Sequence, residues 1–166
     1  MAMEHTTRIR EQEDNDFKVA SAVMRMLFSG VTLNIKQETY GSHTDMRMTA
    51  YTRNGDVKYN IEIKSKRDVE TYEEVPLRIA KYLYMKESTR SDERLIYIVL
   101  SNGYYHIFNL DSIDLNKVKM RNWNIKDTEY DSRSMKSVHP CMFIPLSMQN
   151  CTGIIPRKIM IEYADY

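Results

Sequence analysis

The amino-acid sequence predicts an α/β (α+β) domain in which a central mixed β-sheet is flanked by helices. Three patterns carry this prediction. Apolar residues recur at helical spacing over residues 16–28, apolar and polar residues alternate over most of residues 31–66, and residues 95–100 form a continuous apolar run. Such patterns are typical of an amphipathic helix, of half-buried strands and of a strand buried on both faces.

Length and composition predict one folded domain over residues 1–166. Hydrophobic residues make up 42% and charged residues 28% of the chain, which excludes a disordered protein. No apolar run approaches the roughly 20 residues of a spanning helix, and no apolar signal core begins the chain. We therefore expect a cytoplasmic protein without a membrane partner, whose two cysteines are reduced thiols.

The elements follow in order along the chain. The helix over 16–28 ends at Ser29-Gly30, because glycine readily adopts the left-handed conformation that closes a helix. Strands are predicted over 31–36, 45–53 and 56–66, and Asn54-Gly55 is the strongest short signal for a type I′ turn between the last two. A second helix is predicted over 73–86, with Pro76 near its start where the missing N–H is harmless. Strands over 95–100 and 104–110 complete a core of about residues 14–110.

The segment 111–166 is predicted to be a C-terminal extension that packs on this core. Its signal is weaker: residues 117–135 are polar, and residues 141–146 and 154–163 suit either peripheral strands or a terminal packing arm.

The predicted hairpin gathers the residues with the most informative chemistry. With Asn54 and Gly55 at the centre of the turn, Asp45 lies opposite Lys64, and Glu62 lies diagonal to Asp45. Opposite side chains are roughly 5 Å apart at Cβ and diagonal ones roughly 7 Å apart, so both carboxylates reach one cation. The Ile63 carbonyl is close enough to add a third oxygen, and such hard oxygen ligands suit Mg²⁺. Lys64 would orient or deprotonate an attacking water and offset charge that develops on phosphorus.

A plainer interpretation of the same residues stays open. Any amphipathic strand can show a Glu-hydrophobic-Lys triplet, and an Asp45–Lys64 pair across two strands is an ordinary surface ion pair. The predicted register also sets Arg47 opposite Glu62. An ion pair there would make the Glu62 carboxylate structural and the site a relic.

Asp45, Glu62-Ile63-Lys64 and the order of the surrounding elements resemble the PD-(D/E)XK nuclease superfamily. This restriction-endonuclease-like fold includes Holliday-junction resolvases and RecB-type nucleases, and its order is helix, strand, Asp-bearing strand, Glu-x-Lys strand, helix, strand. The chain departs from the family pattern at Thr44, where a proline is usual. The resemblance implies hydrolysis of phosphodiester bonds with Mg²⁺, or with Mn²⁺ in its place. It also implies Asp45 and Glu62 as metal ligands and Lys64 as the catalytic lysine.

Further residues follow from the same resemblance. Family members often add an acid from the first helix, for which Glu13 and Asp16 are candidates and Asp16 is preferred; the alternative is a first-turn acid favoured by the helix dipole. Arg78 and Tyr82 have the spacing of the RecB-type Gln-x-x-x-Tyr pattern, with arginine in place of glutamine. Arg78 is a candidate phosphate contact, although Arg78 and Lys81 also suit a solvated helix face.

The basic residues nearest the predicted site are Lys66 and Arg67, which we expect to bind nucleic acid together with Arg78. The net charge of the whole chain is only +1, so a basic surface must be local or formed by oligomerisation, and a homodimer would suit duplex cutting. The predicted function is a Mg²⁺-dependent nuclease that acts on DNA rather than RNA. The alternatives are a catalytically inactive module of the same fold that binds DNA or protein, and an interaction protein unrelated to nucleic acid.

Overall fold

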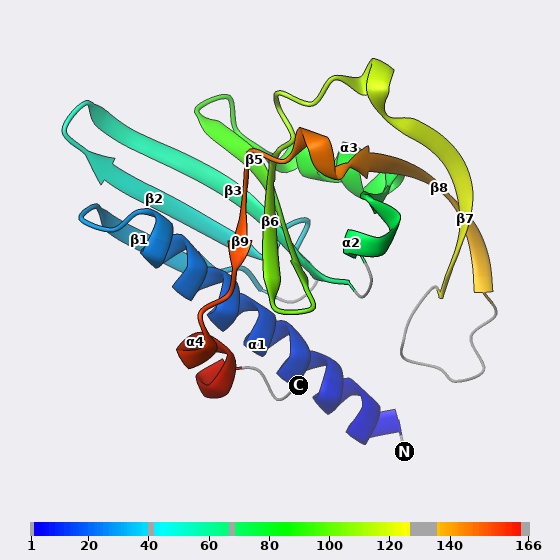
Figure 1. Ribbon diagram of the computed structural model, residues 1–166, viewed down its shortest axis with the longest axis horizontal. Coiled ribbons are helices and arrows are strands. Elements are labelled where there is room, and N and C mark those ends of the chain that lie inside the picture. The colour runs from blue at the N-terminus through cyan, green and yellow to red at the C-terminus, as the bar shows by residue number, and fades with distance from the viewer. Residues whose placement is uncertain (1, 40–41, 67–68, 127–135, 164–166) are drawn as a thin grey trace.

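The structure is a computed structural model that describes residues 2–39, 42–66, 69–126 and 136–163 (Figure 1). In chain order the helices and strands are α1 (Ala2–Leu27), β1 (Thr32–Gln37), β2 (Met46–Thr52), β3 (Gly55–Ser65), α2 (Val69–Tyr72), β4 (Glu74–Arg78), α3 (Ile79–Ser88), β5 (Glu93–Ser101), β6 (Tyr104–Asn109), β7 (Lys119–Lys126), β8 (Lys136–Pro145), β9 (Cys151–Ile154) and α4 (Arg157–Tyr163). Short 3-10 helices precede β7 and β9.

The main sheet has the strand order β1-β2-β3-β5-β6-β9. β3 and β5 are parallel, and the other neighbouring pairs are antiparallel. Parallel neighbours need a crossover connection, which the segment containing α2, β4 and α3 supplies. The prediction of a central mixed sheet with flanking helices is confirmed.

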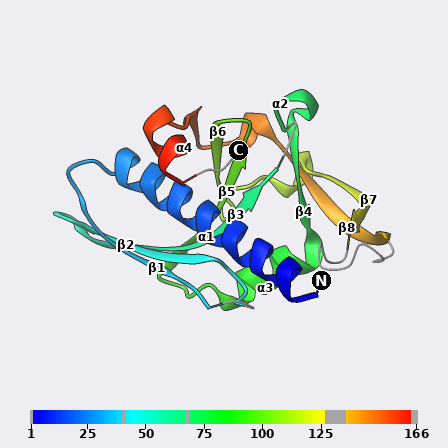
Figure 2. The ribbon, with the colours of Figure 1, turned by 90° about the horizontal axis from the view of Figure 1, so that it is seen from below.

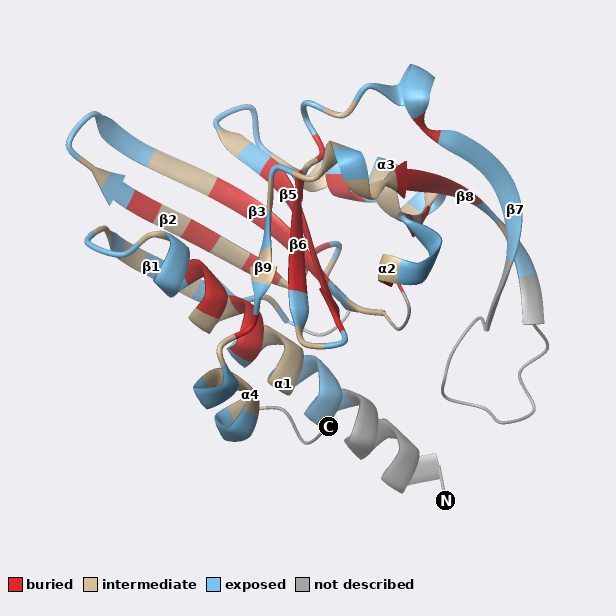
Figure 3. Ribbon diagram, in the orientation of Figure 1, coloured by how far each residue is buried: buried red, intermediate tan, exposed pale blue. Residues whose placement is uncertain are grey.

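Two hydrophobic cores cover the two faces of this sheet. α1 lies across one face (Figure 2), where its buried residues Val19, Ala20, Val23 and Met24 pack against β2, β3 and β5. On the other face, a second sheet of order β4-β8-β7 and the helix α3 cover buried side chains of β5 and β6. Buried residues are accordingly concentrated on the middle strands of the main sheet (Figure 3).

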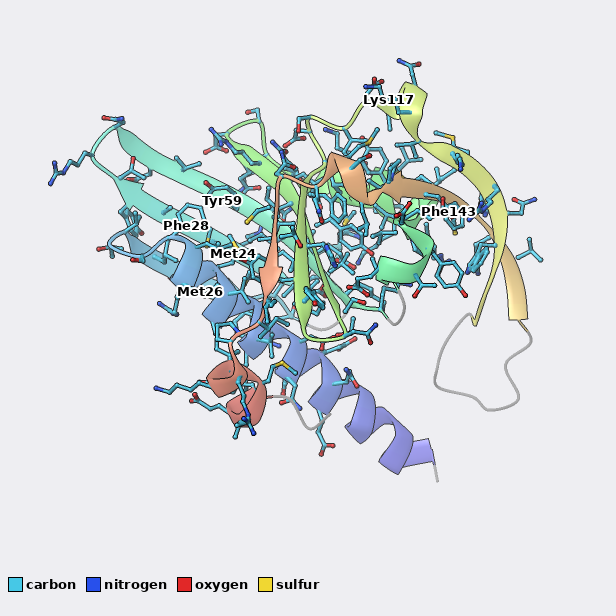
Figure 4. The ribbon with its side chains drawn as sticks, viewed as in Figure 1. Met24, Met26, Phe28, Tyr59, Lys117 and Phe143 are labelled. Carbon is cyan, nitrogen blue, oxygen red and sulfur yellow. The ribbon has the colours of Figure 1, made fainter. Side chains whose placement is uncertain are left out.

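Helix α1 begins well before its predicted start. The residues before Asp16 are polar, but they contain no glycine or proline and many good helix formers, so the helix continues through them. Its apolar stripe faces the sheet as predicted: Met24 is buried, whereas Met26 is 39% exposed (Figure 4). The helix ends before Gly30, which has a positive φ of 84°.

The β2–β3 hairpin is shifted by two residues from the predicted register. Thr52 pairs with Gly55, so Arg53 and Asn54 are the central turn residues. Gly55 has a φ of 115° and Asn54 does not have a positive φ, which fits a type I turn closed by a left-handed glycine and not a type I′ turn. A shift of two residues keeps every side chain on its predicted face, but it gives each side chain a new partner.

The prediction of one helix over residues 73–86 is wrong. Glu73 has a φ of 53° and ends α2, after which Glu74–Arg78 forms β4 and α3 begins only at Ile79. β4 is an edge strand of the second sheet, a position that tolerates Pro76. Val75 and Leu77 alternate with the half-buried residues Glu74, Pro76 and Arg78 and belong to the second core. A spacing of two residues is that of a strand and not of a helix.

The C-terminal segment completes both sheets. β8 lies between β4 and β7, β9 pairs with β6 at the edge of the main sheet, and α4 packs near α1. No helix in the described part of the chain is long and apolar enough to cross a membrane.

Candidate metal and catalytic site

Asp45 lies at the start of β2 and is bound to β3 through two hydrogen bonds. Its backbone N–H donates to the Ile61 carbonyl at 3.0 Å, and its Oδ2 accepts from the Ile63 N–H at 2.7 Å. On its other side, the Asp45 carbonyl accepts from the Glu38 N–H at 2.9 Å. The Asp45 carboxylate is therefore held at the end of the β2–β3 ladder, beside Glu62 and not opposite Lys64 as predicted.

Glu62 is a buried acid on the α3 side of β3, with only 7% of its surface exposed. Its Oε2 is fully buried and forms an ion pair with Lys81 on α3, whose Nζ lies 2.9 Å away. Burial, and then the charge of Asp45, raise the pKa of the Glu62 carboxyl to about 8, against the opposing effects of Lys81 and Lys64. The two lysines offset only part of the cost of ionising Glu62, so a further positive charge beside it would favour its carboxylate form.

Lys64 is exposed on the same face of β3, two residues beyond Glu62. Its positive charge opposes the raised pKa values of Glu62, Asp16 and Glu13. Tyr97 on β5 is the register partner of Glu62, and burial followed by the charge of Glu62 raises the pKa of its phenol well above the usual value.

Both candidate acids of α1 lie near this site. Asp16 Oδ1 accepts a hydrogen bond from Ser65 Oγ at 2.7 Å, and burial raises the pKa of its carboxyl despite that bond. Burial, and then the charge of Asp45, also raise the pKa of Glu13. Among the described residues, however, no three His, Cys, Asp or Glu side chains gather closely enough to hold a metal ion. The arrangement therefore supplies a pair of carboxylates, with the α1 acids outside the pair.

The Ile63 carbonyl extends this pair. In an extended strand the N–H and C=O of one residue point to the same side, as shown by the double hydrogen bonds of antiparallel pairs. Because the Ile63 N–H points to Asp45, its carbonyl is directed toward the same edge, just past the end of β2.

No family model matches the chain, and no curated protein matches its sequence.

Arg47 does not approach Glu62. Its Nη1 lies 2.5 Å from Glu93 Oε1, and its Nε lies 3.4 Å from Glu38 Oε1. The predicted juxtaposition of Arg47 and Glu62 is wrong, because the hairpin register pairs Arg47 with Asn60. This removes the ion pair that would have made Glu62 a structural partner of Arg47.

Of the residues expected to bind nucleic acid, the structure describes Lys66 and Arg78. Arg78 ends β4, and its Nη2 lies 3.3 Å from His139 Nδ1. Burial raises the pKa of the Cys141 thiol, and the charges of Lys66 and Arg78 offset part of that rise. Arg67, the third predicted residue, lies outside the described residues.

Two features of the site escaped the sequence patterns. Lys81, which helical spacing placed on a solvated face, instead pairs with Glu62.

Thr44 is 3% exposed, and its hydroxyl donates to Asn60 Oδ1 at 2.5 Å, while Asn60 Nδ2 donates to Thr89 Oγ1 at 2.9 Å. This buried chain ties the residue before Asp45 to β3 and to the end of α3. No sequence pattern marked this chain of hydrogen bonds, because Asn60 falls on the polar side of the β3 alternation, between Lys58 and Glu62.

Proposed function

We propose that this protein is a Mg²⁺-dependent nuclease that hydrolyses phosphodiester bonds, with DNA as the substrate. The observation that carries the proposal is the buried Glu62 carboxyl beside Asp45, whose pKa remains raised although Lys81 Nζ lies 2.9 Å from its Oε2. A cation bound between two carboxylates relieves both the burial cost of Glu62 and the repulsion from Asp45. The residues therefore fit a divalent metal ion.

Asp45, Glu62 and the Ile63 carbonyl are the proposed ligands. Three oxygens leave room for water and a substrate phosphate, as Mg²⁺ sites in phosphoryl-transfer enzymes do. When bound, the metal polarises the phosphoryl group and lowers the pKa of a coordinated water. The hydrogen bond from the Ile63 N–H holds the Asp45 carboxylate in position, so little ordering is left to occur when the site is filled.

Lys64 is the proposed catalytic lysine. It is exposed, projects from the same strand face as Glu62, and lies close enough to the acids to lower their pKa values. An ammonium in this position orients the attacking water and stabilises the negative charge that develops on the phosphate oxygens.

The order of the elements supports the same proposal. From α1 to β5 the chain runs helix, strand, strand, Glu-x-Lys strand, helical crossover, strand, with Asp45 at the head of the second strand. This is the order of the PD-(D/E)XK superfamily, with β4 inserted in the crossover, and the restriction-endonuclease-like fold is part of the proposal.

A second candidate is an inactive module of the same fold that binds DNA or protein. The observation in its favour is Lys81, whose ammonium already lies 2.9 Å from Glu62 Oε2 and partly neutralises it. In this alternative, Lys81 replaces the metal, and the Asp45–Glu62 pair does not bind Mg²⁺.

Cleavage and metal binding together distinguish the two candidates. Purified protein with Mg²⁺ or Mn²⁺ is incubated with single-stranded DNA, duplex DNA and RNA, and metal binding is measured by calorimetry. We expect the wild-type protein to cleave DNA, and the cleavage rate to fall at least 100-fold in both Glu62→Gln and Lys64→Met. Of these two variants, only Glu62→Gln should lose metal binding. Glu87→Gln on α3 and Lys36→Met on β1 are exposed controls and should behave as wild type.

Equal cleavage by wild type and folded Glu62→Gln would refute the nuclease proposal. Nucleic-acid binding without any Mn²⁺ binding would establish the inactive module instead.

A further inference from the structure

The second sheet presents an outer face that carries most of its charged and aromatic side chains. Pairing aligns Arg78 with Cys141 and Arg121, and aligns Pro76 with Phe143 and Lys119, so these residues share one face. The alternate residues Val75, Leu77, Met142 and Ile144 form part of the second core. We call the opposite side, with Glu74, Arg78, Lys119, Arg121, Trp123, His139 and Phe143, the outer face.

Positive charge dominates the outer face. Arg78, Lys119 and Arg121 face a single described acid of this set, Glu74, which forms an ion pair with Arg121. The whole chain is nearly neutral, with a net charge of +1, so this excess is local. A surface of this kind attracts a polyanion.

Trp123 gives the outer face an aromatic platform. It is 44% exposed, and its ring meets Phe143 edge to face at a centroid distance of 5.3 Å. The Arg121 guanidinium lies 3.7 Å from the Phe143 ring centroid and 5.6 Å from that of Trp123. Phe143, labelled in Figure 4, is only 2% exposed, so its buried ring contacts both side chains from a fixed position. A large exposed ring that is held in place by buried neighbours loses little freedom when a base stacks on it.

The outer face is continuous with the candidate site. Lys66 follows Lys64 on the same face of the chain, and Lys66 and Arg78 both influence the Cys141 thiol, which lies on β8 between Arg78 and Arg121. Cations of the outer face thus lie on β4 and β7, on either side of Cys141, and Lys66 follows the proposed catalytic residue Lys64 along the chain. β7 and β8 lie at the opposite side of the molecule from α4 (Figure 1).

We propose that the outer face binds an unpaired nucleic-acid strand, with a base stacked on Trp123 and phosphates bound by Arg78, Lys119 and Arg121. The proposal rests on the proposed function for the chemical class of the ligand. Stacking on an exposed ring needs a base that is free of its complementary strand, whereas a duplex offers only its backbone and base edges. The substrate that fits is consequently single-stranded, or a duplex with an unpaired end or flap.

The sole tryptophan of the chain makes this proposal directly measurable. Binding of a fluorescently labelled single-stranded oligonucleotide is measured by anisotropy in EDTA, so cleavage plays no part, and quenching of Trp123 fluorescence is measured with an unlabelled strand. We expect both signals to saturate at the same concentration, and a blunt duplex of the same sequence to bind at least 10-fold more weakly.

Variants locate the contact. Trp123→Leu should weaken single-strand binding roughly 10-fold or more. Lys119→Gln should reduce the salt dependence, the slope of log affinity against log salt, by about 0.7, as expected for one lost phosphate contact on a single strand. Matched controls are Tyr104→Leu, an exposed aromatic on β6, and Lys158→Gln on α4; both should bind as wild type.

Thermal melting confirms that each variant is folded, and Lys119→Gln tests the face even if Trp123→Leu does not fold. Anisotropy binding without tryptophan quenching, wild-type affinity in both outer-face variants, tighter binding of the blunt duplex, or no oligonucleotide binding at all would each overturn the proposal. None of these results bears on whether Glu62 is needed for Mg²⁺-dependent cleavage, so the two proposals fail separately.

Discussion

Asp45 binds the peptide groups on both sides of Glu62. Its N–H donates to the Ile61 carbonyl and its carboxylate accepts from the Ile63 N–H, so the backbone itself sets the two acids next to each other. Glu62 is buried, and its pKa is raised both by that burial and by the neighbouring charge of Asp45. A carboxyl whose pKa is raised by burial and by a neighbouring acid is a common feature of functional sites.

Metal binding should depend on pH through Glu62. Because the pKa of Glu62 is about 8, the free protein holds a proton there at neutral pH, and a metal ion must displace it. We expect the apparent affinity for Mn²⁺ to rise about tenfold per pH unit from pH 6 to pH 7.5 and to level off above pH 8. Calorimetry in buffers of different ionisation enthalpy measures both the affinity and the released proton. A flat profile with no proton release would contradict the assignment.

Glu62 should also make the free protein less stable as pH rises. Its folded pKa of about 8 exceeds the usual 4.5, so the folded state binds more protons than the unfolded state between these values. The stabilisation of the folded state by this bound proton is fully present below pH 4.5 and is lost as the pH rises through about 8. The total change in the free energy of unfolding is on the order of a few kcal/mol. The melting temperature of Glu62→Gln relative to wild type should therefore increase from pH 6 to pH 9. Glu87→Gln, exposed on α3, should show no such trend.

Lys81 should tune the protonation of Glu62. Removing its ammonium with Lys81→Met eliminates one of the charges that lower the pKa of Glu62, so that pKa should move upward. The shift is measured by the carboxyl ¹³C titration of Glu62. Lys86→Met is the matched control, because Lys86 lies on the same helix but pairs with Asp111. An unchanged titration in Lys81→Met would show that the ammonium is not close to Glu62 in solution.

The Thr44 hydroxyl should stabilise the fold next to Asp45, where it bonds to Asn60 of β3. Its hydroxyl is buried and donates to Asn60 Oδ1, so Thr44→Val leaves that buried oxygen without this donor. We expect a loss of about 1–3 kcal/mol in the free energy of unfolding, measured by urea denaturation. Thr32→Val on the exposed side of β1 should change it by less than about 0.5 kcal/mol. Equal stability of the two variants would exclude a structural role for the Thr44–Asn60 bond.

Glu70 should hold α2 against the main sheet. Its Oε1 lies 2.9 Å from Nε2 of the buried His106, and its Oε2 accepts from Ser101 Oγ at 2.9 Å. Burial raises the pKa of Glu70, but the hydrogen bonds from His106 and Ser101 outweigh it and the net pKa lies below the usual 4.5.

A depressed carboxyl pKa stabilises the fold above the usual value, and this stabilisation is lost as pH falls through the lower, folded value. Glu70→Gln should thus melt at a lower temperature than wild type at pH 7, with the difference shrinking below pH 4. A difference that stays constant down to pH 3 would assign the loss to packing and not to the charge.

Much of the fold followed from local patterns. The apolar stripe of α1, the alternation in β2 and β3, and the buried run of β5 all lie where periodicity placed them, because burial of apolar area acts on each element separately. The prediction over residues 73–86 is wrong because the spacing of Leu77 and Tyr84 fits two structures equally well: one continuous helix, or a strand that contains Leu77 followed by a helix that contains Tyr84. The pairing of β4 with β8, which lies some 65 positions later in the chain, decided between them.

For the candidate site, the sequence alone determined which residues share a strand face: Glu62 and Lys64 project together because side chains alternate along β3, whatever the register. Only the tertiary structure decided which groups they meet. The turn at Arg53 and Asn54 brought Asp45 beside Glu62 and carried Arg47 away to Glu93, and the packing of α3 over the sheet brought in Lys81. A shift of two residues leaves every apolar side chain of the strand on the buried face. Hydrophobicity therefore determines which face of a strand is buried, whereas turn geometry and packing determine which residues lie opposite one another.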